Sequence, residues 1–199
     1  MAGLAGGLAM YVWMSVAHMA LPLARVGISQ VGGKESALLS AMQSSLGNSS
    51  GMYIFPGFDF SGNQAAAMKA YDAKLVNNPS GILIYHPPGA QGMTARQLIG
   101  EFLLELFEAM LAVWLLAQTT ISGFWSRVGF MAAAGLLASL PTNTSNLIWY
   151  GFPATYTAAT MFTEIVAFTV AGCAASLVLK RPRVTASAPD KAYSSAHAK

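Results

Sequence analysis

The chain has 199 residues, of which 54% are hydrophobic and only 10% carry a charge. Soluble domains of this size carry charges on about 25% of their residues, so much of this surface is expected to face something other than water. The formal net charge of +3 has its excess in the C-terminal tail, which favours a membrane surface over nucleic acid as the partner. The single cysteine, Cys173, excludes an internal disulfide and a zinc site built from cysteines.

Four apolar segments predict transmembrane helices at residues 2–23, 98–119, 128–150 and 156–179. A helix needs about 20 mostly apolar residues to cross a bilayer. The first segment lacks the basic start of a signal peptide, so we expect it to be retained. The apolar part of the third segment is short and runs into a polar block at residues 141–146. A re-entrant third segment is therefore an alternative to a full crossing.

The stretch between the first two helices is too long and too regular for a linker. Apolar residues recur at helical spacing in residues 34–46 and 63–76. Residues 51–57 predict a short strand closed by a turn, and residues 81–85 predict a second strand that ends at a Pro-Pro-Gly turn. These elements form a small α/β cap with little core of its own, which is expected to lean on the helices.

The predicted fold is therefore mainly α: a four-helix transmembrane bundle with a small α/β extracytoplasmic insertion between helices one and two. Its parts are helix one at 1–24, the cap at 25–97, helices two to four at 98–179, and a disordered basic cytoplasmic tail at 180–199. Lys180, Arg181 and Arg183 follow the last helix, and Arg127 lies in the turn between helices two and three. The positive-inside rule places these residues, and both termini, in the cytoplasm.

Five ionisable residues fall in or near the predicted helices: His18, Glu101, Glu105, Glu108 and Glu164. The three glutamates of helix two are spaced i, i+4 and i+7, which puts them on one stripe. In the predicted topology all five residues lie at a similar depth. Small and polar residues also recur along one face of the third and fourth helices, and we expect these faces to line the bundle interior: Gly135, Ser139, Thr142 and Asn146, with Thr157, Thr160, Glu164, Ala167 and Ala171.

Two interpretations of this set remain open. In the first, the carboxylates and the imidazole converge on a metal ion or relay protons, since ionisable groups inside a membrane are functional candidates. In the second, Glu105 and Glu108 bond side chains of the third helix, and Glu164 is protonated or paired with His18. No Glu-x-x-His pair is present, so the di-iron carboxylate pattern is absent. The cofactor is thus unknown, with a metal ion as one possibility.

Two features of the cap are candidate contact sites. Four aromatic residues, Tyr53, Phe55, Phe58 and Phe60, fall close together, and such patches commonly mark partner surfaces. The alternative is that they pack on the protein's own helices. His86 lies in a rigid Tyr-His-Pro-Pro-Gly turn, where it is a ligand, a docking contact or simply a surface turn residue.

Four short motifs carry a resemblance to a known family: HMALPL at 18–23, GMYIFPG at 51–57, PSGILIYHPPG at 79–89 and WYGFP at 149–153. With these motifs the chain resembles a family of uncharacterised bacterial polytopic inner-membrane proteins. The resemblance covers most of the chain before the tail. It implies a bacterial inner membrane and carries over no activity, cofactor or partner.

Three functions are compatible with these observations. The first is an accessory or assembly subunit of a larger membrane complex, with the lipid bilayer and other membrane proteins as partners and no nucleic acid. The second is a metal- or proton-dependent membrane enzyme or redox protein that uses the Glu/His site. The third, a small carrier, is disfavoured because no repeat pairs broken helices across two halves.

Overall fold

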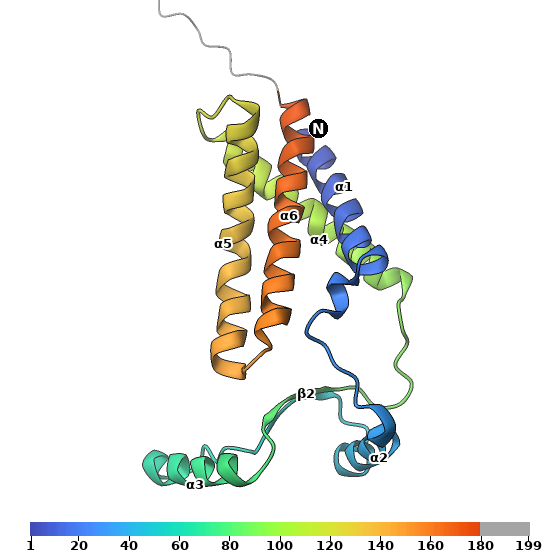
Figure 1. Cartoon of the computed structure of the whole chain (residues 1–199), viewed down its shortest axis with the longest axis vertical. Coiled ribbons are helices and arrows are strands. Elements are labelled where there is room, and N and C mark those ends of the chain that lie inside the picture. The colour runs from blue at the N-terminus through green and yellow to red at the C-terminus, as the bar shows by residue number, and fades with distance from the viewer. Residues whose placement is uncertain (180–199) are drawn as a thin grey trace, which may run out of the picture.

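The computed structural model describes residues 1–179, and the predicted basic tail at 180–199 lies outside the described residues. The described part is mainly helical, with one small sheet. Four helices form a bundle: α1 (Ala2–Ser15), α4 (Ala95–Ala117), α5 (Phe124–Tyr150) and α6 (Ala154–Val178). Helix α1 packs between α4 and α6, while α5 packs mainly on α6. The α1/α4 pair is tilted against the α5/α6 hairpin, and the two pairs diverge toward the cap (Figure 1).

Glycines bring the helices of the bundle close together. A Cβ atom built on Gly7 of α1 would lie 2.8 Å from Leu106 Cα of α4, and one on Gly172 of α6 would lie 2.8 Å from Met131 Cβ of α5. Small residues at helix contacts allow such close approach of two backbones. Between α1 and α6, Trp13 Nε1 donates a hydrogen bond of 3.0 Å to the Thr163 carbonyl. These contacts fix the order of the four helices.

The first and third predicted helices differ most clearly from the prediction. The first helix changes at Ser15 to a π-helical turn, Val16–Ala20, and the chain becomes extended at Leu21, before Pro22. The third predicted segment is one continuous helix of 27 residues that runs through Pro141. Residues 141–146 are therefore helical, and the break expected of a re-entrant segment is not found there.

Among the described helices, α6 alone combines the length and the hydropathy needed to cross a membrane. Helix α1 has only 14 residues before its π-helical turn. Helix α4 carries three glutamates within its apolar part, and α5 contains the polar block after Pro141. A four-helix bundle is thus present in the described part of the chain, and its four membrane crossings stay a prediction.

The cap contains the four predicted elements: α2 (Glu35–Leu46), β1 (Gly51–Phe55), α3 (Gln64–Asn77) and β2 (Gly81–Tyr85). The two strands pair antiparallel, with Gly51 opposite Tyr85 and Phe55 opposite Gly81. The local signals that predicted these elements are strong, because Gly and Pro end both strands and Asn63 caps α3 through its side chain.

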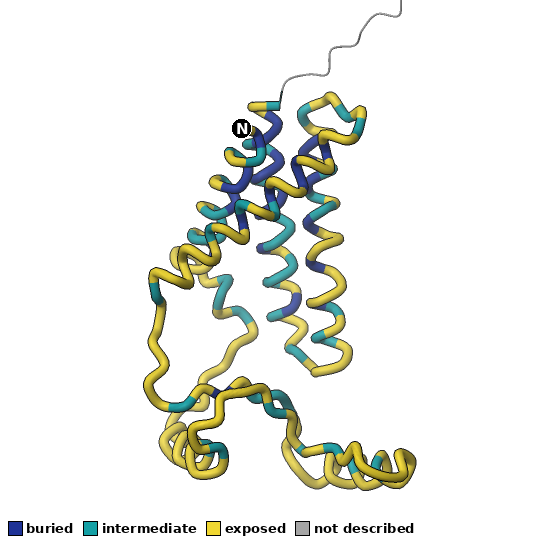
Figure 2. The backbone as a smooth tube through the Cα atoms, turned by 180° about the vertical axis from the view of Figure 1, so that it is seen from behind, coloured by how far each residue is buried: buried dark blue, intermediate teal, exposed yellow. Residues whose placement is uncertain are grey.

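The cap does not lean on the bundle, so that expectation is wrong. Tyr85 is the only buried residue in the fully described stretch between Ala17 and Glu105. Figure 2 shows the cap as an almost wholly exposed arm below the helices. Within the described residues, close contact with the bundle is found at the start of the cap. Gly27, which has a φ of +76°, lies so close to α6 that a Cβ atom built on it would be 2.5 Å from the Tyr156 backbone nitrogen. The apolar side chains of the cap are therefore left uncovered by the rest of the chain.

Candidate functional site

The glutamate stripe of α4 begins close to the capped start of that helix. Thr94 and Gln97 form a capping box, which sets the helix register from which the glutamates follow. Glu101 is exposed and Glu108 is half-buried, whereas Glu105 is only 3% exposed. The Glu105 Oε2 atom is buried and has no hydrogen-bond partner. The stripe predicted from the sequence is thus present, with its middle member inside the bundle.

Glu164 of α6 completes a group that we call the acidic wedge: Glu101, Glu105, Glu108 and Glu164. The first, third and fourth of these line one cavity of about 200 Å³, which is bounded by all four helices of the bundle. Glu105 lies on the same stripe of α4 but is buried and does not line this cavity. The remaining lining is mostly apolar: Met10, Met14, Leu104, Ala138, Ala167 and Phe168.

His18 lies next to the acidic wedge rather than inside it. It sits on the π-helical turn that follows α1, is exposed, and its Nδ1 atom is 2.9 Å from the Met14 carbonyl oxygen. Together with Glu164 and Tyr156 it lines a second cavity of about 230 Å³. The two cavities share Met14 and Glu164 as lining residues. No hydrogen bond joins His18 to Glu164, so the predicted pair shares a cavity without direct contact.

The structure revises how the glutamates bond the third predicted helix. Asn143 Nδ2 of α5 donates to Glu164 Oε2 at 3.4 Å and to the Ser139 carbonyl at 2.9 Å. The predicted bonds from Glu105 and Glu108 to this helix are not found. Gly135 and Ser139 are buried as expected, but Asn143 takes the inward place that the sequence pattern gave to Thr142 and Asn146. A continued spacing of four from Gly135 and Ser139 would have identified Asn143.

Arg127 is not a loop residue, in contrast to the prediction. It lies in the first turn of α5, is 5% exposed, and donates from Nε to the Ile121 carbonyl and from Nη1 to the Leu179 carbonyl. The second bond reaches the end of α6, where backbone carbonyls lack partners within the helix. Arg127 therefore links the start of α5 to the end of α6, a role that its sequence position did not reveal.

The acidic wedge does not have the geometry of a metal cage. Among residues 1–179, no three His, Cys, Asp or Glu side chains are grouped so that they could hold one metal ion. Cys173 is half-buried on α6 and is a free thiol. Glu101, Glu108 and Glu164 share a cavity, but they do not converge as metal ligands would. What the arrangement offers is carboxyl groups beside a mostly apolar cavity.

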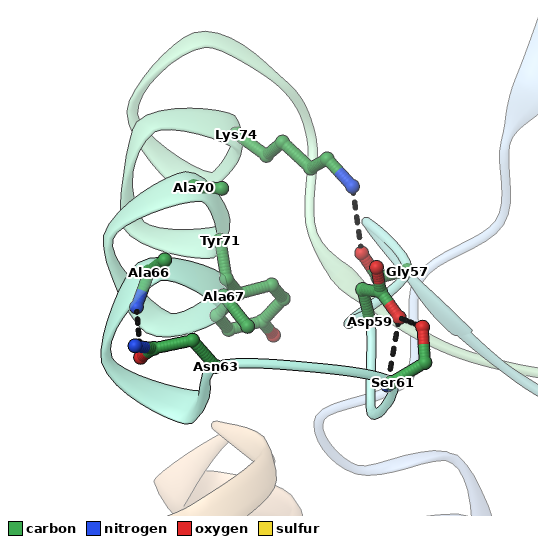
Figure 3. Close-up of a pocket in the computed structure, with 9 residues that line it drawn as sticks. All are labelled: Gly57, Asp59, Ser61, Asn63, Ala66, Ala67, Ala70, Tyr71 and Lys74. Carbon is green, nitrogen blue, oxygen red and sulfur yellow. Dashed lines mark hydrogen bonds between the residues drawn. The ribbon is translucent and has the colours of Figure 1, made fainter.

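A further cavity, of about 340 Å³, lies in the cap (Figure 3). Its polar groups are engaged with one another. Ser61 donates from its backbone N–H and its hydroxyl to Asp59 Oδ1, Asn63 caps the N-terminus of α3, and Lys74 Nζ donates to the Gly57 carbonyl at 3.0 Å. The bonds from Ser61 hold the pKa of the Asp59 carboxyl below its usual range. This network fixes the turn between β1 and α3.

The predicted aromatic surface is divided between two places. Phe58 contacts Phe60 and also Tyr71 of α3, with ring centroids 4.9 and 5.4 Å apart. No described ring contact joins Tyr53 or Phe55 to this group; Tyr53 instead donates its hydroxyl to the Ser49 carbonyl. Phe60 is 91% exposed. Phe58 thus packs on the cap's own helix, Phe60 stays exposed, and the partner surface stays a prediction.

His86 is exposed just after β2, as expected of a turn residue. Its neighbour Tyr85 is buried and donates its hydroxyl to the Gly47 carbonyl at 2.8 Å. The tyrosine, which the sequence did not single out, ties the strand to the loop after α2.

No protein-family model, curated protein or solved structure matches this chain.

Proposed function

We propose that this protein is a small multi-pass subunit of a larger membrane complex, in which the helices lie in the bilayer and the cap docks a partner subunit. The single observation that carries the proposal is the cap: a folded segment that leaves its apolar side chains exposed and does not pack on the bundle. A segment of this kind needs another surface to bury its apolar side chains.

The membrane part of the proposal is supported by the exterior of the bundle. Large apolar side chains are exposed along all four helices, including Leu8 at 57%, Phe107 at 61%, Leu137 at 71% and Phe162 at 53%. Such an exterior matches lipid chains rather than water. Helices α4, α5 and α6 have 23, 27 and 25 residues, and about 20 residues suffice to cross a bilayer. Together with α1 and its π-helical turn, they make up the four proposed crossings.

The docking part rests on one face of the β1–β2 sheet. Met52 and Ile54 pair with Ile84 and Ile82, so all four side chains lie on the same face. Met52, Ile54 and Ile84 are 61%, 55% and 68% exposed. An uncovered apolar sheet face fits a protein partner with an apolar surface of its own.

The compartment follows from the charge pattern and the motif resemblance. A bacterial inner membrane with both termini in the cytoplasm puts the cap outside the cytoplasm. The partner in this proposal is then another membrane protein subunit with an extracytoplasmic surface.

Photo-crosslinking in the native membrane tests the docking role. A photoreactive residue at Ile84 or Phe60 is expected to yield a specific adduct with a second protein. The same probe at Gln43, an exposed polar position of α2, serves as the matched control. Purification in mild detergent should also give a particle larger than a monomer in its micelle. A clean monomer without adducts would overturn the proposal.

A second candidate function is a proton- or metal-dependent membrane enzyme. The observation that favours it is the acidic wedge, which provides more carboxyl groups than helix packing requires. Metal bound in stoichiometric amount to purified monomer would promote this candidate over the docking subunit.

A further inference from the structure

We infer that the free edge of β2 pairs with the same edge of a second copy of this chain, so that two caps are joined through a four-stranded antiparallel sheet. The proposed function uses the apolar face of the sheet, whereas this pairing uses its edge and therefore goes beyond that function. Three features of the strand carry it: an open edge, a sequence that is complementary to itself, and the absence of charge.

The first feature is the open edge of β2. The sheet of the cap consists of β1 and β2, so within residues 1–179 the outer edge of β2 has no strand beside it. None of the backbone hydrogen bonds that the described residues form outside helices and strands involves residues 81–85. A two-stranded hairpin is marginally stable in water, and further strands or a covering helix are needed for independent stability. The outward N–H and C=O groups of β2 are therefore a template for a further strand.

The second feature is the sequence of the strand. Between β1 and β2, each terminal glycine lies opposite an aromatic residue: Gly51 opposite Tyr85, and Gly81 opposite Phe55. The Phe55 ring is close to Gly81, since a Cβ atom built on this glycine would be 3.1 Å from Phe55 Cζ. A cross-strand aromatic residue of this kind shields a glycine in a sheet. Strand β2 itself begins with glycine and ends with an aromatic residue, so it follows the same rule when it pairs with a copy of itself.

Antiparallel pairing of two β2 strands about Leu83 defines one register. Leu83 then lies opposite Leu83 of the second copy, while Ile82 opposes Ile84 twice and Gly81 opposes Tyr85 twice. Cross-strand pairs of β-branched residues stabilise a sheet. In this register Ile82 and Ile84 of both copies stay on one face, so the apolar face continues from one cap to the other. A shift by one residue would turn these side chains to opposite faces.

The third feature is charge. Residues 75–94 contain no Asp, Glu, Lys or Arg, and the same is true of residues 36–58. Natural proteins protect single sheet edges with lysine, proline or a bulge. No lysine, proline or bulge interrupts residues 81–85. Two copies of β2 can therefore meet without repulsion between like charges, whereas a charged partner strand would find no opposite charge.

The membrane supplies what the small contact area lacks. A pair of five-residue strands is a small contact beside the roughly 1,000 Å² that a stable interface needs. In the proposed topology both copies lie in one bilayer with their caps on the same side, which raises their effective concentration. The edge thus pairs two copies within the membrane, and the apolar face remains available to the partner subunit of the proposed function.

Cysteine crosslinking of the full chain in native membranes tests the register. Directly opposite residues of an antiparallel pair have Cα atoms about 4.5–5.5 Å apart, within reach of a disulfide. In a Cys173→Ser background, Leu83→Cys is therefore expected to form a disulfide-linked dimer on oxidation with copper-phenanthroline. Ile84→Cys is the matched control, because its two copies would be diagonal neighbours about 7–8 Å apart.

The control also detects random collisions between chains. Ile84 is 68% exposed, so collisions alone would give Ile84→Cys at least as much dimer as the less exposed Leu83→Cys. The inferred pairing instead gives severalfold more dimer at Leu83. Equal yields at the two positions would overturn the inference. A dimer through Tyr53→Cys on β1, in place of Leu83→Cys, would also overturn it, since the other edge of the sheet would then be the contact.

Charge exchange provides a second measurement that does not depend on a disulfide. Leu83→Lys puts two like charges opposite each other, and so does Leu83→Asp. Co-purification of two differently tagged copies should therefore fall by about fivefold in either variant. Co-expression of Leu83→Lys with Leu83→Asp should restore it, because the charges are then opposite. No recovery in the mixed pair, with each variant present in the membrane at its usual level, would overturn pairing at Leu83.

The outcomes separate this pairing from the proposed function. A photo-adduct of Ile84 with a second kind of protein, without the disulfide at Leu83, supports docking and overturns the pairing of copies. A disulfide at Leu83 without such an adduct supports the pairing and overturns the docking role.

Discussion

Asn143 of α5 donates a side-chain hydrogen bond of 3.4 Å to Glu164 of α6, which lines a cavity together with Glu101 and Glu108. The same amide donates to the Ser139 carbonyl, which holds Asn143 against its own helix. The bond is the only polar contact between a glutamate of the wedge and another helix in the described part of the chain. It therefore sets where the Glu164 carboxyl lies within the bundle.

Replacing Asn143 by leucine should destabilise the bundle by about 1–3 kcal/mol, because the Glu164 carboxyl is left without its donor. The measurement is a thermal melt of the purified protein in detergent. Thr142→Leu, at the exposed neighbouring position, is the control and should be mild. Equal melting temperatures for Asn143→Leu and the unaltered protein would mean that the bond does not contribute to the stability of the folded protein.

Glu105→Leu should be no less stable than the unaltered protein, although Glu105 is only 3% exposed. Leucine has a similar volume, and removing a buried carboxyl with an unpartnered oxygen can be neutral or stabilising. Ala109→Leu is the contrasting variant. Ala109 is 0% exposed, so a larger side chain there should cost about 1–3 kcal/mol. Loss of the folded protein on Glu105→Leu would show that the carboxyl has a structural partner.

Gly7→Ala should separate α1 from α4 and lower the melting temperature. The new Cβ would lie 2.8 Å from Leu106 Cα, a backbone atom that cannot move alone. Overpacking of this kind costs about 1–3 kcal/mol. Gly129→Ala in α5 is the matched control, because nothing lies within 4 Å of its Cβ position. This control should be neutral or stabilising by up to about 1 kcal/mol, the helix preference of alanine over glycine.

The cap provides a prediction on pH. Because hydrogen bonds from Ser61 lower the folded-state pKa of Asp59, the turn is stabilised above the unfolded pKa, and this stabilisation is lost as the pH falls through the folded pKa. Carboxyl carbon shifts measured by NMR over the acid range should report the lowered pKa. Ser61→Ala should move that pKa back up toward its usual value. Identical titrations of the two proteins would contradict the assigned cause.

Reporter fusions test the proposed topology. A fusion at Asn63 in the cap and one after Lys199 should give opposite compartment signals, because an odd number of crossings separates them in the four-span arrangement. Equal signals would favour three crossings, with part of α5 not spanning.

The elements of the cap and the long helices follow from the sequence by itself. Periodic apolar residues, glycines and prolines act within a few residues along the chain, so they fix β1, β2, α2 and α3 without reference to distant segments. The stripe of Glu101, Glu105 and Glu108 is equally local, because the helix repeat alone places them on one side of α4.

Only the tertiary structure decided which of these residues meet. The order of the helices, with α1 between α4 and α6, depends on close contacts at Gly7 and Gly172 between segments far apart in the chain. That order buries Glu105 rather than Glu101, turns Asn143 toward Glu164, and brings Arg127 to the end of α6. Packing between distant segments is set by the shapes of both surfaces at once, and a periodic pattern on one helix does not contain that information.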